Sequence, residues 1–267
     1  MSETNKVKDT IEAVTGLVEA VPVYEDLAQP AAKELGKTLL TGAKLINMAL
    51  SPISAMVWGY DQVRDFIIPK LEEKLKKVPE ENIITPDPII AVPTIEALRY
   101  TASNETLREL YANLLANSMN SETKISTHPS FVEIIKQLTS DEAKILKYIY
   151  DCKLSTDGVI QLISINDDNT YHIVLDVFTD LPFLANCDNT DMVQPYFENL
   201  TRLKLINYDF NHTRSNKNVY DRLENHFEIQ KLIQTLKEED ATTHTKFKRG
   251  VLTTTLFGDH FLKSCLG

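Results

Sequence analysis

The sequence has few cysteines, and their placement excludes a disulfide-bonded fold. The chain of 267 residues holds only Cys152, Cys187 and Cys265, which lie far apart. An odd number of widely spaced cysteines is not a disulfide framework, and no two of them form the CxxC pair common in zinc sites. We therefore expect three reduced thiols in a cytoplasmic protein.

Glycine is also scarce, which excludes the loops that cradle phosphate groups. The eight glycines are scattered singly, so the sequence contains neither the GxxxxGK[ST] motif nor the GxGxxG motif. The GxSxG signature of a serine nucleophile is absent, and the six His residues form neither HExxH nor HxH. We predict no cofactor, no metal, no small-molecule ligand and no catalytic activity. An enzyme of unfamiliar type stays open, because convergent sites need not leave a motif.

Long hydrophobic runs and a signal peptide are missing as well. No uncharged apolar stretch reaches the length of about 20 residues that a helix needs to cross a bilayer. The N-terminus, MSETNKVKDTIEAV, lacks a basic region followed by an apolar one. The cytoplasm is therefore the expected location.

Positive charge is in deficit, which argues against nucleic-acid binding. The chain carries 28 Lys and Arg against 38 Asp and Glu, a formal net charge of −10. Such a chain as a whole repels the phosphate backbone of a nucleic acid. Two stretches are locally basic, HTRSNK (212–217) and HTKFKR (244–249), and we interpret both as solvated loops.

What the sequence does contain, in its first third, is helical periodicity interrupted by prolines. Residues 9–20 predict a short amphipathic helix, and residues 30–50 predict a second helix that begins at Pro30. Ser51 and Pro52 read as the N-cap and first turn of a third helix, which Pro69 should kink or end. Residues 78–93 carry four prolines and predict an extended connector.

The middle of the chain shows stronger helix signals. Asn104 is a plausible N-cap for a helix in which Leu107 and Leu114 share one face. Pro129 marks the start of another helix. Thr139 and Glu142 have the spacing of a capping box, which opens the helix EAKILKYIYD.

Beyond residue 150 the pattern changes to a mixture of strands and helices. Residues 159–165 and 171–177 are β-branched and predict strands, with helix as the alternative. A helix follows from residue 191, with Tyr196, Leu200 and Leu203 pointing inward, and exits into the strand-like LINYDF. Residues 219–237 predict a helix that could begin as a strand, and the chain ends as strand, turn and short helix.

These elements predict a mainly α fold with three regions. An N-terminal helical region (1–79) and a central helical region (80–138) form a helical bundle. A C-terminal α+β module (139–267) follows, and its order of helices and strands is typical of a winged-helix-like domain.

Residues 35–60 allow two interpretations. Between Lys44 and Asp61 the chain carries no charge, so two weakly polar helices there form either a buried core hairpin or a hairpin that enters a membrane. Asn47, Ser51 and Ser54, with arms too short to span a bilayer, favour the core. Insertion of helices 30–68 on activation is the alternative.

Several segments together resemble a known family. They are YEDLAQPAAKELGKTL, ALSPISAMVWGYDQV, PTIEALRYTASNETLRELYANLLANSM, HPSFVEIIKQLTSDEAKIL and LTTTLFGDHFLKSCL, in this order over nearly the whole chain. They resemble the bacterial abortive-infection alpha family, and the stretch from LYANLLA through HPSF is the most specific part. The resemblance implies defence against bacteriophage, in which infection triggers growth arrest or death of the host cell. The resemblance assigns no catalytic residue to this chain.

The candidate functional residues lie in three motifs: the hairpin at 30–60, the helix at 107–119 and the turn at 128–131. The candidate interaction residues are Trp58, Tyr60, Tyr111, Asn113, His128, Pro129 and Phe131. For each of them, core packing or helix capping is the competing interpretation. We expect a non-enzymatic defence protein that acts through a protein partner or as a homo-oligomer, with membrane association only on activation. A DNA-binding winged-helix regulator is the third hypothesis.

Overall fold

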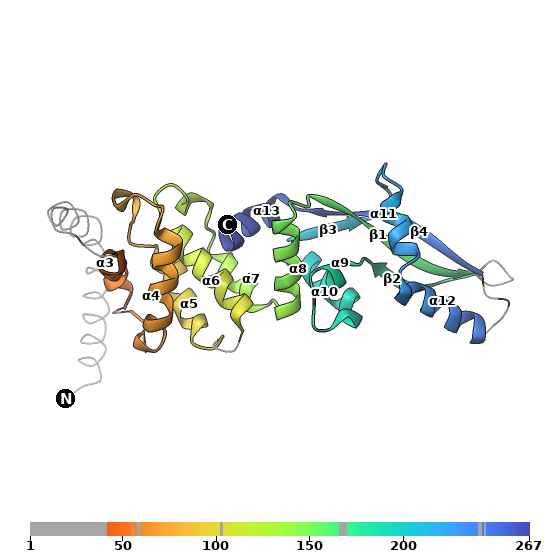
Figure 1. Cartoon of the computed structure of the whole chain (residues 1–267), viewed down its shortest axis with the longest axis horizontal. Coiled ribbons are helices and arrows are strands. Elements are labelled where there is room, and N and C mark those ends of the chain that lie inside the picture. Colours follow the sequence, from red (N-terminus) through yellow and green to blue (C-terminus); the bar gives the residue numbers. More distant parts are fainter. Residues whose placement is uncertain are drawn as a thin grey trace, which may run out of the picture.

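The computed structural model describes residues 42–54, 56–57, 60–101, 104–165, 170–239, 242 and 244–267. Within this part the protein is mainly helical and carries one four-stranded antiparallel sheet. The described part is elongated (Figure 1). The helices α3 to α7 lie at one end, α8, α10 and α13 lie in the middle, and the sheet projects to the other end.

Helices make up most of the described chain. Their bounds are α3 Gly42–Ser54, α4 Asp61–Leu75, α5 Pro88–Leu98, α6 Glu105–Ser118, α7 Ser130–Lys136, α8 Ser140–Asp151, α9 Leu181–Leu184, α10 Val193–Arg202, α11 Asn218–Glu224, α12 Phe227–Glu239 and α13 Leu256–Leu266. Short 3₁₀ turns occupy Glu80–Asn82, Lys124–Ser126 and Thr190–Met192. The helix predicted at 9–20 and the start of the helix predicted at 30–50 lie outside the described residues.

The prolines of the N-terminal region do not mark the predicted helix boundaries. Helix α3 continues through Ser51 and Pro52 to Ser54, so the prediction that a new helix opens there is wrong. Helix α4 likewise runs through Pro69. A proline inside a helix removes one backbone hydrogen bond, and buried side chains such as Leu50 and Leu71 offset this loss by packing into the core.

The predicted connector is shorter than the sequence suggests. Helix α5 begins at Pro88, where the Asp87 side chain accepts a hydrogen bond from the Ile89 N–H at 2.9 Å, and it includes Pro93. An Asp N-cap followed by proline is a favoured helix start. Of the predicted connector, residues 78–87 lack an α-helix and residues 88–93 belong to α5, so the prediction of an extended chain up to Pro93 is wrong.

Residues 42–54 form one helix, so the hairpin predicted to turn at Ser51 and Pro52 is wrong, but the apolar face of this helix lies in the core as the core interpretation predicts. Ile46, Leu50 and Ile53 form a buried face of the helix within the hydrophobic core. Among the described residues, no helix is both long enough and apolar enough to cross a membrane.

The helix starts predicted in the middle of the chain are confirmed. The Asn104 side chain accepts a hydrogen bond from the Leu107 N–H at 3.1 Å, at the start of α6. Helix α7 begins directly after Pro129. Thr139 and Glu142 form the predicted capping box at the start of α8.

The sheet has the strand order β2-β1-β4-β3 and is antiparallel throughout. Its strands are β1 Thr156–Ile165, β2 Tyr171–Phe178, β3 Ile206–Asp209 and β4 His244–Thr254. The predicted strands at 159–165 and 171–177 are therefore confirmed. The pairing of β1 with β4 runs without interruption from Thr156↔Thr253 to Ile165↔His244, which makes the long ribbon that projects from the molecule (Figure 1).

Two predictions for the C-terminal region need correction. The single helix predicted at 219–237 is two helices, α11 and α12, which are separated at Asn225 and His226. The basic stretch 244–249 is part of β4 and not a loop. The helix α10, the strand after it and the closing helix α13 are as predicted, and Tyr196, Leu200 and Leu203 are buried.

The described fold is α+β in its C-terminal half, but it does not confirm a winged helix. The sheet has an additional strand, β2, and two helices stand between β3 and β4. The structure establishes a mainly helical protein with a small antiparallel sheet.

Candidate interaction site

A groove opens between the N-terminal helices. It has a volume of about 480 Å³ and is lined by α3, by the end of α4 and by the connector that follows α4. Its apolar lining comes from Leu45, Ile46, Leu75, Val78 and Ile83. Ile46 and Leu75 are buried beneath the groove, whereas the side chain of Leu45 is half-buried. Of this apolar lining, the side chains of Leu45, Val78 and Ile83 are partly exposed.

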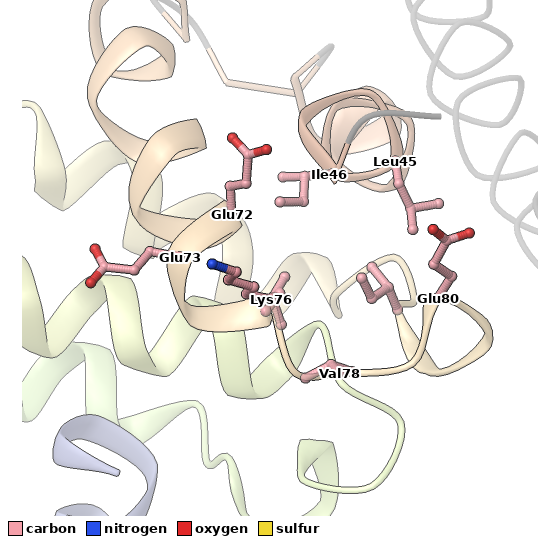
Figure 2. Close-up of a pocket in the computed structure, with 10 residues that line it drawn as sticks. Leu45, Ile46, Glu72, Glu73, Lys76, Val78 and Glu80 are labelled. Atoms are coloured by element: carbon pink, nitrogen blue, oxygen red, sulfur yellow. The ribbon is translucent and has the colours of Figure 1, made fainter. Parts of the chain in front are cut away.

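Charged side chains surround this apolar floor. Figure 2 shows Glu72 of α4 and Glu80 of the connector beside the space below α3, with Lys76 between α4 and the connector. Leu45 and Ile46 point from α3 into the same space, while Glu73 points away from it. An apolar floor with a polar rim is the usual composition of a protein-binding surface.

The predicted residue Asn113 lies in a second place, at the junction between α6 and the C-terminal helix α13. Its Nδ2 donates a hydrogen bond to the Cys265 carbonyl at 2.8 Å, and Asn117 Nδ2 donates to the Ser264 carbonyl at 3.0 Å. The Ser264 hydroxyl in turn donates to the Ser126 carbonyl at 2.9 Å. The last carbonyls of a helix have no partner within it, so α6 caps the end of α13.

The predicted turn at His128 meets the other end of α13. The Phe131 ring is buried and lies 5.4 Å from the ring centroid of Phe257 and 5.3 Å from that of Phe261. His128 is exposed, and its ring lies 6.1 Å from Phe257. The Ser130 N–H donates to His128 Nδ1 at 3.1 Å, which fixes the turn around Pro129. The structure thus brings Asn113, His128 and Phe131 together around one helix.

The other predicted residues are Tyr111, Tyr60 and Trp58. Tyr111 is buried, and burial raises the pKa of its hydroxyl well above the usual value. Tyr60 is half-buried and packs against the core at the start of α4. Trp58 lies outside the described residues. Tyr111 therefore has the packing role that was its competing interpretation.

A cluster of charged side chains that the sequence did not predict lies beneath α11. Arg222 contacts Asp180 twice, through Nε at 2.8 Å and Nη2 at 2.9 Å, and its Nη2 lies 3.4 Å from Asp157 Oδ2. Both carboxylates are buried. Burial raises the pKa of Asp180, an effect that Arg222 opposes and Asp157 reinforces. The three residues are distant in the sequence and belong to no motif, so no local signal points to them.

This cluster reads as a structural ion-pair network. A two-point contact between a guanidinium and a carboxylate is strong and directional. Here it ties α11 to Asp180, which directly precedes α9, while Asp157 of β1 lies next to the same guanidinium. Among the described residues, no group of three or more His, Cys, Asp or Glu side chains is placed to hold a metal ion.

A further buried carboxylate, Asp141, anchors the loop before α10. Its oxygens accept hydrogen bonds from the Asp188 and Asn189 N–H groups, each at 2.9 Å, and from the Tyr196 hydroxyl at 2.8 Å. Lys144 lies 3.1 Å away. Burial raises the pKa of Asp141, but these donors outweigh it and lower the pKa to about 2. The carboxylate is therefore held ionised as a loop anchor.

The fold and these sites define a mainly helical protein with a small antiparallel sheet, an apolar groove among its N-terminal helices and a helix junction in its middle. The chain belongs to the abortive infection alpha family, because the model of that family matches residues 59–265. Three of the stretches within the segments that carry the resemblance, LYANLLA, HPSF and LFGDHFLKSCL, meet at the α13 junction.

Comparison with solved structures adds one relative. The chain is similar to an uncharacterized protein from the hydrocarbon-degrading marine bacterium Alcanivorax borkumensis SK2, with 17% sequence identity and a TM-score of 0.35. The similarity covers 55% of this chain and 96% of that one. No curated protein matches the chain.

Proposed function

We propose that this protein defends bacteria against phage by abortive infection and acts by binding another protein, without a catalytic step of its own. The observation that carries the defence role is the family match over residues 59–265. The groove between α3, α4 and the connector supports the mode of action, because it offers apolar side chains within a charged rim.

The groove suits an apolar side chain of a protein partner. Covering Leu45 and the floor beneath it would remove apolar surface from water, which is the main driving force of most protein association. Glu72, Lys76 and Glu80 would remain at the rim, where charges contribute more to specificity than to affinity.

The membrane alternative has less support from the described residues. The apolar face of α3 is occupied by its packing in the core, and inserting it into a bilayer would require this packing to be broken. The DNA alternative relied on two basic loops, one of which is in fact part of β4.

The proposal predicts that Leu45→Glu abolishes phage protection and leaves the fold intact. A charge placed on the groove lining would have to be desolvated when the partner binds. The measurement is the survival and phage yield of bacteria that express the chain, together with the melting temperature of the purified protein.

The matched control is Ile125→Glu, since Ile125 is 92% exposed and lies outside the groove. This variant should protect as the parent chain does. Full protection by Leu45→Glu would exclude the groove as the site of action. Absence of protection by the parent chain against every phage tested would contradict the defence role itself.

A further inference from the structure

The joint between α11 and α12 is built around one histidine. His226 lies directly before Phe227, the first residue of α12, and its carbonyl accepts a hydrogen bond from the Gln230 N–H at 3.0 Å. Its Nδ1 accepts another from the Glu228 N–H at 3.4 Å, which requires a neutral ring with its proton on Nε2. The first N–H groups of a helix have no partner within it. The His226 side chain therefore caps the start of α12.

Aromatic rings from three elements surround the same imidazole. The ring centroid of His226 lies 4.5 Å from that of Phe183 in α9 and 5.1 Å from that of Phe178 in β2. Phe227 of α12 is the third neighbour, at 4.7 Å. The His226 side chain is half-buried among them. These contacts tie the first turn of α12 to the end of β2 and to α9.

The charged groups that act on His226 also come from three elements. Asp180 directly precedes α9, Arg222 lies on α11 and Glu228 lies on α12. Burial lowers the pKa of His226 and Arg222 lowers it further, whereas Asp180 and Glu228 raise it. The lowering effects prevail. The neutral ring is thus the form that this joint accommodates.

Protonation of His226 removes what holds the start of α12 in place. An imidazole with a proton on both nitrogens cannot accept the Glu228 N–H. A positive charge is unfavourable at a helix N-terminus, and a charge among apolar rings loses its hydration. We propose that His226 is a pH-sensitive latch, whose neutral ring holds the first turn of α12 against Phe178 and Phe183 and whose protonation frees that turn. The groove is lined by residues 42–83, so the latch is independent of the proposed function.

The direction of the pH dependence follows from the two states of the joint. The opened turn exposes His226 and lets its pKa return to the usual value of about 6.5, above that of the closed joint. The stabilisation by the neutral ring is therefore complete above that usual value and is lost as the pH falls through the lower pKa of the closed joint. Below both, opening increases tenfold for each unit that separates them.

The first experiment is amide hydrogen exchange of the full chain at about pH 8 and about pH 5, which bracket the titration of histidine. After correction for intrinsic exchange rates, the Glu228 and Gln230 amides should lose protection at the lower pH. The amides of α6 serve as the internal reference and should keep theirs. NMR titration of the His226 ring should give a pKa below that of an unstructured peptide with the same residues.

The matched variant is His226→Asn. Asparagine is a good N-cap and does not titrate, so the first turn of α12 should have the same protection at both pH values. His260→Asn is the control, because it removes an exposed histidine of α13 and should leave the response of α12 as in the parent. Equal protection of the parent at both pH values, or a His226→Asn variant that keeps the pH response, would overturn the proposal.

Discussion

Asp141 shows how a single buried carboxylate can organise a loop that is distant in the sequence. It lies on α8, yet it accepts hydrogen bonds from backbone groups 47 and 48 residues further along the chain. Charge-assisted hydrogen bonds of this kind are stronger than neutral ones. The loop before α10 therefore depends on the ionised form of one side chain.

We predict that Asp141→Asn lowers the free energy of unfolding by about 2 kcal/mol, because a pKa held about two units low corresponds to roughly that energy. Chemical denaturation at neutral pH measures it. The control is Asp188→Asn, since the side chain of Asp188 is largely exposed, and its effect should be small.

The same residue predicts a pH dependence. The folded pKa of Asp141 is about 2, below the value of about 3.9 expected in the unfolded chain. Its contribution is therefore complete above about pH 4 and is lost as the pH falls toward 2. In Asp141→Asn this part of the acid destabilisation should be missing. An unchanged acid profile would contradict the anchoring role.

At the scale of elements, the start of α13 depends on a glycine. The Gly258 N–H donates to Thr255 Oγ1 at 2.8 Å, which caps the helix. A Cβ atom at Gly258 would lie 1.9 Å from the Leu205 carbonyl oxygen, which belongs to the backbone and cannot rotate away. The close approach of α13 to the chain before β3 therefore requires glycine.

We predict that Gly258→Ala destabilises the protein by about 2 kcal/mol or more, as overpacking of a tight contact does. The thiol of Cys265, which is fully buried in the same helix, should also react faster with a thiol reagent. Gly42→Ala is the control, because a Cβ there meets Glu72 only at ordinary contact distance. If Gly258→Ala has the stability of the parent, the close approach of α13 to the Leu205 carbonyl does not require glycine.

At the scale of the whole molecule, α13 joins the C-terminal end of the chain to its central helices. It follows the sheet in sequence but packs against α6 and α8 in space (Figure 1). Asn113 and Cys265 are 152 residues apart and are bound to each other. The predicted boundary at residue 138 is thus crossed by hydrogen bonds and by the Phe131–Phe261 contact.

We predict that residues 1–138, expressed alone, lack a cooperative thermal transition, because the groups of α6 and α7 that contact α13 lose their partners. Adding residues 139–267 should restore part of the structure. Circular dichroism during heating measures both effects. A fragment that melts cooperatively at the temperature of the full chain would show that the helical regions fold independently.

The sequence alone determined the features that depend on neighbouring residues. The N-cap at Asn104 and the capping box at Thr139 join groups within one helical turn, and both were predicted correctly. Two β-branched runs predicted β1 and β2 for the same reason, since alternation and turn residues are local signals. The family resemblance also followed from the order of short segments.

Only the tertiary structure decided where these elements meet. Pro52 and Pro69 lie inside helices because core packing outweighs the lost hydrogen bonds, and local propensity contains no information about that packing. The Arg222 network and the capping of α13 by α6 join residues that are distant along the chain. Such contacts are fixed by the three-dimensional arrangement of the whole chain, which no window of sequence records.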